Sequence, residues 1–371
     1  MRKPASIFWG LLLLITAILQ SCHNGAHEKE SDYKGTKYNL PVTNLLGKPR
    51  APYADSLTVE GIELGRRLFY DVHLSKDGKK SCFSCHRLEY AFSDPGVALS
   101  MNETGMTTRN AQPLQNLAWL TAYFWDGRSS TLQQQAQDAF AHELALDTVK
   151  AVKYVEGDTT DMCLYKKAFG RPGVVTATKL NLAMEEFLLS AVSCNSRFDS
   201  VMRGQAKFTQ EEADGYNKVF SLRTGDCIQC HRSIGRTFLF TDSRFHNNGL
   251  DKVDNIKDFK DAGRGSITHN ESDYGLFRTP SLRNVAVSAP YMHDGRFKTL
   301  RKVIDFYSDS LHYSPTVDPN IVIHLSPEKR ADQHSNGGMH LTEKEKEELL
   351  SFLNTLTDTS FLHNPALQNP F

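Results

Sequence analysis

Two short segments of the sequence carry the same pattern of two cysteines and a histidine, C-x-x-C-H. The first lies in SCFSCH and the second in DCIQCH. Two thiols at this spacing add across the vinyl groups on one edge of a haem, and the adjacent histidine falls beneath the iron as its proximal ligand. We therefore predict two covalently bound c-type haems. The attaching residues are Cys82, Cys85 and His86 in the first segment and Cys227, Cys230 and His231 in the second.

Zinc is the main alternative for cysteine-histidine segments of this kind. A zinc ribbon needs a second C-x-x-C pair, or a Cys/His pair at short range, for each site. Neither segment has such a partner in the sequence. Chance is also a poor explanation, because this cysteine and histidine content gives roughly 0.005 accidental matches to the pattern.

The elements that must position the haems are predicted to be helical. Apolar residues recur at the helical period over Leu57–Tyr70, Thr131–Ala145 and Thr178–Met202. Thr209 and Thr342 are each followed three residues later by glutamate, which is a capping box that opens a helix. We expect a mainly α fold with two cytochrome c-like haem domains and long loops.

The chain of 371 residues is long enough for two domains. Because the two haem segments start 145 residues apart, we expect each half to wrap one haem. The expected N-terminal haem domain covers 46–205 and the C-terminal haem domain covers 206–371. Residues 1–21 are read as a signal peptide and 22–45 as a polar tether.

The N-terminus has the features of an export signal. Arg2 and Lys3 precede an apolar run, Ile7–Leu19, that is short for a membrane span. Cys22 follows a small residue, as in bacterial lipoproteins, in which cleavage leaves a lipid on that thiol. An ordinary secretory peptide with an incidental cysteine is the alternative. Either reading predicts export to the periplasm or cell envelope, with membrane attachment only through a lipid on Cys22.

Charge and the remaining cysteines give weaker guidance. Lys plus Arg equals Asp plus Glu at 43 each, so the net charge offers no argument for a nucleic-acid partner. Cys163 and Cys194 lie outside the haem segments and the signal. In an exported protein they either bridge each other or stay buried as thiols, and a bridge is slightly favoured.

Further motifs surround both haem segments. They read LGRRLFYD at 64–71, RNAQP at 109–113, FWDGR at 124–128, FRTPSLRN at 277–284 and PYMHDG at 290–295. With the two C-x-x-C-H segments they resemble, in order, the bacterial di-haem cytochrome c peroxidase family, which includes the MauG-type enzymes. The resemblance covers roughly residues 60 to 310.

The resemblance implies that the first haem meets peroxide while the second feeds or holds electrons. Trp125 matches a tryptophan between the haems and is a candidate relay, although buried tryptophans are more often core residues. Gln135 and Glu143 match the polar pair on the peroxide side, where a proton must move between the two oxygens. They are eight residues apart on a helical stretch and share a face. His142 is an alternative base.

Two departures from the family pattern concern the sixth ligands. The segment at 100–108 lacks the histidine that caps the peroxide-binding iron in classical members, so we expect an open or water-bound first haem. Met101 or Met106 are alternative, weak caps. At the second haem, Tyr307 stands where classical members have methionine and MauG-type enzymes have tyrosine. A tyrosinate stabilises ferric iron, and Met292 is the competing ligand.

The resemblance also implies a calcium ion between the haems, held by hard oxygen donors. The matching positions are Asn110, Ser288 and Pro290.

The expected function is peroxide reduction with electrons from a small redox protein such as a cytochrome c or a cupredoxin. A MauG-type enzyme that uses peroxide to oxidise residues of a partner protein is the second hypothesis, which Tyr307 favours. A non-catalytic di-haem electron carrier is the third hypothesis, which the missing histidine disfavours.

Overall fold

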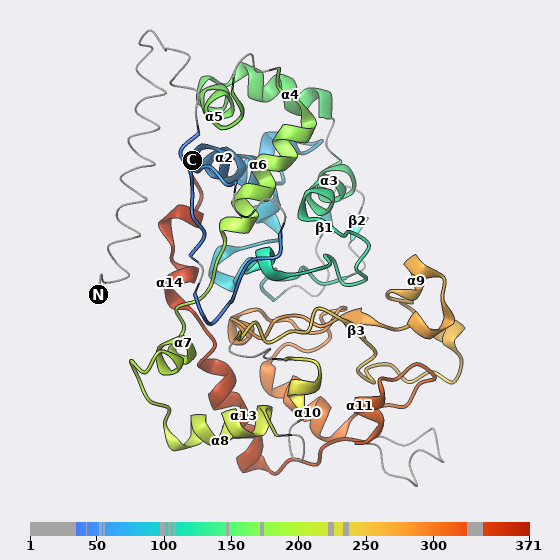
Figure 1. Ribbon diagram of the computed structural model, residues 1–371. Coiled ribbons are helices and arrows are strands. Elements are labelled where there is room, and N and C mark those ends of the chain that lie inside the picture. Colours follow the sequence, from blue (N-terminus) through green and yellow to red (C-terminus); the bar gives the residue numbers. More distant parts are fainter. Residues whose placement is uncertain are drawn as a thin grey trace.

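The computed structural model shows a mainly helical molecule with long loops, as the sequence predicts (Figure 1). It describes residues 35–41, 43–51, 54, 56–96, 101–102, 105–106, 109–145, 148–170, 174–221, 226–232, 237–324 and 337–371. The expected signal peptide, and with it Cys22, lies outside these ranges. None of the described helices has the length and apolar character that crossing a membrane requires.

The helices divide between the two halves of the molecule. In chain order they are α2 (Val59–Tyr70), α3 (Leu132–His142), α4 (Thr148–Gly157), α5 (Thr159–Phe169), α6 (Ala177–Ser190), α7 (Arg197–Met202), α8 (Gln210–Val219), α9 (Gly265–Thr268), α10 (Leu300–Asp309), α11 (Pro319–Val322), α13 (Glu343–Asn354) and α14 (Thr359–Leu362). The described strands form two antiparallel pairs, β1 (Met101–Asn102) with β2 (Gly105–Met106) and β3 (Phe245–His246) with β4 (Phe277–Arg278).

Each half is built on one close helix crossing. In the first half α2 packs on α6, and in the second α8 packs on α13. A Cβ atom added to Gly65 would lie 1.9 Å from the backbone oxygen of Ala183, and one added to Gly215 would lie 1.9 Å from that of Glu348. Each glycine therefore lets two helix backbones touch. The capping boxes predicted at Thr209 and Thr342 open α8 and α13.

The helix predicted for Thr178–Met202 is wrong as a single element. It ends as α6 at Ser190, and α7 starts afresh after an extended link. The backbone N–H groups of Cys194 and Asn195 donate to Asp358 Oδ2 at 3.0 and 2.8 Å instead of to helical carbonyls. Ser196 then caps α7. A carboxylate far away in sequence supplies the acceptor, so local periodicity does not reveal the break.

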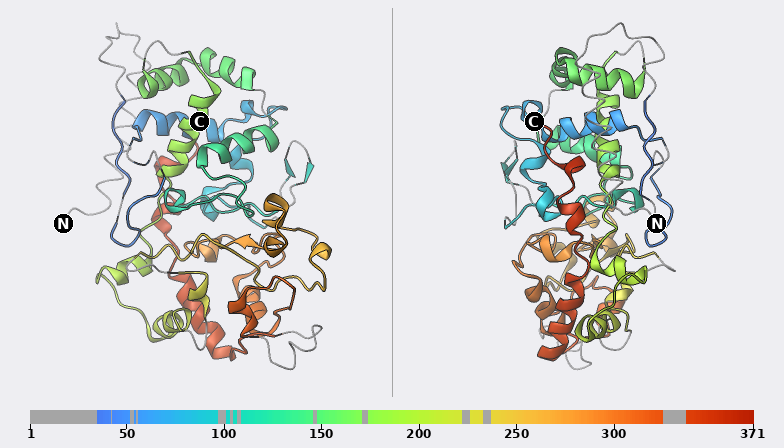
Figure 2. Two further views of the ribbon diagram at one scale, coloured as in Figure 1. Left: turned by 45° about the vertical axis from the view of Figure 1, so that its right-hand side comes forward. Right: turned by 90° about the vertical axis from the view of Figure 1, so that its left-hand side faces the viewer.

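Two large apolar cores lie in the two halves. The first draws on residues between Leu40 and Ala191, and the second on residues between Phe198 and Leu356. The last part of the chain returns to the first core, where Phe361 and Leu367 are buried. The C-terminus accordingly lies in the half that contains α2 and α6 (Figures 1 and 2).

The two halves repeat one backbone plan at an offset of 168 residues. Asn116 and Asn284 both have a φ of 57° and both precede a 3₁₀ turn. Tyr123 bridges Ser129 just as Tyr291 bridges Phe297. Thr131 caps α3 and Thr299 caps α10, each through its side chain. The paired positions in this list are Asn116/Asn284, Tyr123/Tyr291, Ser129/Phe297 and Thr131/Thr299.

The same offset relates the backbone contacts that join the halves. The N–H of Asn110 donates to the carbonyl of His293 at 2.7 Å, and the N–H of Arg278 donates to the carbonyl of Trp125 at 2.8 Å. Asn110 pairs with Arg278, and Trp125 with His293, at 168 residues. The halves therefore meet about an approximate two-fold axis.

Candidate di-haem site

The first C-x-x-C-H segment lines a cavity of about 360 Å³ in the first half. Cys82 starts a 3₁₀ turn, and the N–H of His86 donates to its carbonyl at 2.9 Å. This turn brings both thiols and the imidazole to one wall. His86 Nδ1 lies 2.6 Å from the carbonyl oxygen of Phe92. That contact fixes the ring so that Nε2 is left for an iron.

The second segment repeats this arrangement around a smaller cavity of about 220 Å³. The N–H of His231 donates to the carbonyl of Cys227 at 2.8 Å, and His231 Nδ1 lies 3.0 Å from the carbonyl oxygen of Phe240. Burial raises the pKa of Cys82 and of Cys227 to about 12, so both stay neutral thiols until they are alkylated. The donor set in each half fits a covalently attached haem.

Trp125 and Arg278 line both cavities. Trp125 Nε1 donates to the carbonyl of Asn110 at 2.9 Å. Arg278 is buried and donates to the carbonyl of Phe124 at 3.2 Å and to Gln112 Oε1 at 3.1 Å. Burial lowers the pKa of Arg278 to about 10, because no described carboxylate pairs with it. A buried cation without an acidic partner suits the anionic propionates of a haem.

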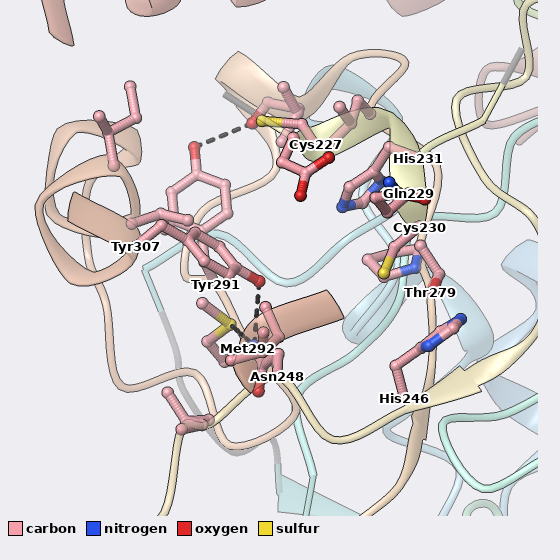
Figure 3. A pocket seen from close by; sticks show the side chains of 18 of the residues that line it. Cys227, Gln229, Cys230, His231, His246, Asn248, Thr279, Tyr291, Met292 and Tyr307 are labelled. Carbon is pink, nitrogen blue, oxygen red and sulfur yellow. Dashed lines mark hydrogen bonds between the residues drawn. The ribbon is translucent and has the colours of Figure 1, made fainter. Parts of the chain in front are cut away.

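Tyr307 and Met292 both enter the second cavity. Figure 3 shows them, with Asn248, across the cavity from Cys227, Cys230 and His231. Asn248 Nδ2 donates to the Tyr307 hydroxyl at 3.0 Å and lies 3.6 Å from the Met292 sulfur. Burial raises the pKa of Tyr307, which the Asn248 hydrogen bond opposes. The phenol therefore stays neutral here unless a cation such as ferric iron faces it.

Gln135 and Glu143 both line the first cavity, together with His142. Gln135 Oε1 is buried and accepts no hydrogen bond within the described structure. A buried acceptor without a donor is costly unless a ligand or water supplies one. Glu143 is the only carboxylate among the described residues that line this cavity, and it is half-buried. The side chains of Met101 and Met106 lie outside the described part of the chain.

Helices α3 and α10 present equivalent faces to the two cavities. Because they obey the offset of 168 residues, three positions on α3 and just beyond it have direct counterparts. All six residues line their own cavity. The counterparts are Gln135 and Val303, Ala139 and Tyr307, and Glu143 and Leu311. The first cavity thus has two polar groups and a methyl where the second has two apolar groups and a phenol.

The positions predicted for calcium lie near the contact between the halves and line neither cavity, except for Asn110. The backbone of Asn110 meets His293, a few residues beyond Ser288 and Pro290. Within the described ranges no cluster of three or more histidine, cysteine, aspartate or glutamate side chains could hold a metal. A site made of amide and carbonyl oxygens is of another kind, and calcium stays a prediction.

The favoured bridge between Cys163 and Cys194 is wrong. Cys194 is a free thiol, whereas Cys163 is disulfide-bonded, so they do not bond each other. Cys194 lies in the link between α6 and α7, where its N–H is held by Asp358. Burial raises the pKa of Cys194 to about 11, which keeps it unreactive.

Sequence reasoning missed several residues of the second cavity. Asn248, which holds the Tyr307 hydroxyl, follows no recognisable pattern. His246 lines the same cavity between Asp318 Oδ2 at 2.5 Å and Asp242 Oδ2 at 3.0 Å. Although burial opposes its charge, hydrogen bonds to Asp242 and Asp318 raise the pKa of His246 to about 12. Arg278, by contrast, had a signal, since it belongs to the FRTPSLRN motif.

The chain is similar in sequence and in fold to di-haem cytochrome c peroxidases and MauG proteins. Residues 59–207 match the family model described as di-haem cytochrome c peroxidase. The methylamine utilization protein MauG of Methylorubrum extorquens is 31% identical over 95% of this chain and 94% of its own. The cytochrome c551 peroxidase of Nitrosomonas europaea is 33% identical over 66% of this chain and 71% of its own. A crystal structure of a MauG-like protein associated with microbial copper homeostasis superposes with a TM-score of 0.76, at 31% identity, over 90% of this chain and 99% of that one.

Proposed function

Because the chain belongs to the di-haem cytochrome c peroxidase family, whose members are oxidoreductases with two c-type haems, we propose that it reduces hydrogen peroxide to water. The reaction consumes two electrons and two protons for each peroxide and releases two waters. A small redox protein, a cytochrome c or a cupredoxin, supplies the electrons.

The contrast between the two cavities is the observation that carries this proposal. The first cavity has Gln135 and Glu143 where the second has Val303 and Leu311. At these equivalent positions of α3 and α10, polar groups that can hydrogen-bond a peroxide or carry its proton therefore face only the first cavity. An electron carrier needs no such group at either centre, so the asymmetry favours catalysis at the first.

The residues of the first cavity divide the work as follows. Haem attached to Cys82 and Cys85 and ligated by His86 would bind the peroxide and supply its reducing electrons. Glu143 takes the proton from the bound oxygen and returns it to the far oxygen, which leaves as water. Gln135 orients the peroxide with its buried carboxamide oxygen, which accepts no hydrogen bond from the described residues.

Trp125 is proposed as the relay between the centres. It lines both cavities, and its indole N–H bonds to Asn110, whose own N–H bonds to His293 in the other half. Electrons entering at the second haem would follow this connected path. Tyr307, across the second cavity from His231, is proposed as the sixth ligand there, in preference to Met292, because Asn248 donates to its hydroxyl at 3.0 Å.

A second candidate function is the oxidation of residues of a partner protein at the expense of peroxide. The specific observation in its favour is that a tyrosine, Tyr307, and not a methionine alone, lines the second cavity. An anionic oxygen ligand stabilises ferric and higher oxidation states of iron, so such a centre would be suited to sharing the oxidising equivalents that peroxide supplies at the first.

Export is part of the same proposal. The charged and apolar N-terminal segment supports secretion to the periplasm or cell envelope. Mass spectrometry of the mature N-terminus tests this: a chain that begins at Met1 would rule it out.

The function is tested by peroxide turnover with the purified di-haem protein. We expect reduced cytochrome c or a reduced cupredoxin to be oxidised at two equivalents for each peroxide. Oxidation of a co-purified protein, with little turnover of either donor, would favour the second candidate. An electron paramagnetic resonance spectrum with both ferric centres sealed by nitrogen or sulfur ligands would remove both and leave an electron carrier.

A further inference from the structure

We propose that Ala139 is the residue that keeps the sixth coordination position of the first haem open, by leaving empty the place that Tyr307 fills at the second. The inference rests on the proposed function of the first haem, and it assigns the difference between the two centres to one pair of equivalent positions. Both residues line their cavities.

The equivalence of the two positions follows from the backbone. Ala139 lies eight residues after the cap of α3 at Thr131, and Tyr307 lies eight residues after the cap of α10 at Thr299. The bridge, the 3₁₀ turn and the cap that precede each helix all repeat at 168 residues. A side chain at position 139 therefore leaves the backbone at the place and in the direction that Tyr307 does.

The helix face around Ala139 agrees with this placement. Gln135 and Glu143 lie one turn to either side of it, on the face that lines the first cavity. An alanine between two polar side chains leaves room for a small molecule that both can reach. The first cavity is also the larger one, at about 360 Å³ against about 220 Å³, as expected when a phenol is missing.

The second cavity shows what the missing group does. The Tyr307 hydroxyl accepts a hydrogen bond from Asn248 in the second cavity, across from His231 (Figure 3). A ligand from the protein at this point prevents an external molecule from binding the iron. Helix α10 thus carries a ligand in the second half, whereas the equivalent helix α3 forms the wall of a substrate pocket in the first.

The experiment counts how many cyanide ions the ferric di-haem protein binds, followed by optical titration. We expect one cyanide for the native protein, none for Ala139→Tyr and two for Tyr307→Ala. The electron paramagnetic resonance spectrum of Ala139→Tyr should lose the signal of the open centre. The matched control is Ala141→Tyr, the same change on an exposed position of α3, which should keep one cyanide.

Each result decides a separate question. One cyanide and an unchanged spectrum in Ala139→Tyr would overturn the role of Ala139 while leaving the proposed function intact. If Ala139→Tyr does not fold, Tyr307→Ala combined with Met292→Ala decides, and a count of one there would overturn the equivalence. A native protein that binds no cyanide would instead contradict an open first haem, and with it the proposed function.

Discussion

Replacing Glu143 with glutamine gives the sharpest test of the proton transfer. The change keeps the size and shape of the side chain but removes its capacity to carry a proton. Among the described residues that line the first cavity, Glu143 is the only carboxylate, and Arg109 is already paired with Asp126 and Asp261. His142 lines the same cavity and is a neighbour able to take over as a base.

The expected loss follows from this inventory. A positioned general acid or base contributes about 10²–10⁴-fold to a rate, which corresponds to roughly 2.7–5.4 kcal/mol of transition-state stabilisation. Because His142 lines the same cavity, we expect Glu143→Gln to fall at the lower end, about 10²-fold. Adding His142→Gln should lower the rate further.

The assay is the second-order rate of peroxide consumption by the purified protein, with haem content measured in the same sample. Glu211→Gln, an exposed carboxylate on α8, is the matched control and should keep the native rate. A Glu143→Gln protein that retains both haems and reacts within about twofold of native, far short of the range for acid–base catalysis, would refute the assignment.

Three further outcomes follow from the structure. Trp125→Phe removes the indole N–H that donates to the carbonyl of Asn110. We expect slower electron transfer between the two haems after a pulse of peroxide, with unchanged spectra of the iron ligands. An unaltered transfer rate would exclude Trp125 as the relay. Gly215→Ala forces α8 away from α13 and should lower the unfolding free energy by about 1–3 kcal/mol, measured as a lower Tm. The control Gly157→Ala, which has open space around it, should leave the Tm unchanged. Equal Tm values for the two variants would contradict the close helix crossing. Asp199 pairs with the buried Arg283 through two hydrogen bonds of 2.9 Å. Although burial opposes ionisation, Arg283 lowers the pKa of Asp199. The ion pair therefore stabilises the fold above the unfolded-state pKa of about 3.9, and this stabilisation is lost as pH falls. Asp199→Asn should cost about 3–5 kcal/mol at neutral pH, and an acid unfolding curve that this variant shares with the native protein would count against the pair.

Patterns with short-range causes were predictable from the sequence. The capping boxes at Thr209 and Thr342 each open a helix, since the bonds they make stay within four residues. The period over Leu57–Tyr70 anticipated α2. The break after α6 was missed because its acceptor, Asp358, comes from the far end of the chain. The pairing of Cys163 was misjudged for a similar reason, since cysteine spacing does not determine connectivity.

Some features of the candidate site were likewise predictable from short stretches of sequence, whereas others depended on tertiary packing. Covalent chemistry requires adjacent residues, so the two haem attachment segments could be read directly from the sequence. Which side chains face which cavity depends on the register between distant helices. The contact of Asn248 with Tyr307 appears only once the second half is folded, whereas the family resemblance had already predicted that Trp125 lies between the haems.

The sequence by itself determined that this protein presents two C-x-x-C-H segments on a helical chain, because each of those features is encoded in a few neighbouring residues. The tertiary structure decided that the two halves share one backbone plan, and that Ala139 and Tyr307 occupy equivalent positions in it. The repeat leaves a trace in the sequence, since Asn116/Asn284, Tyr123/Tyr291 and Thr131/Thr299 are identical pairs, but the residues of α3 and α10 that face the cavities differ. The chemical difference between the two cavities therefore becomes visible only when the helices that line them are compared in space.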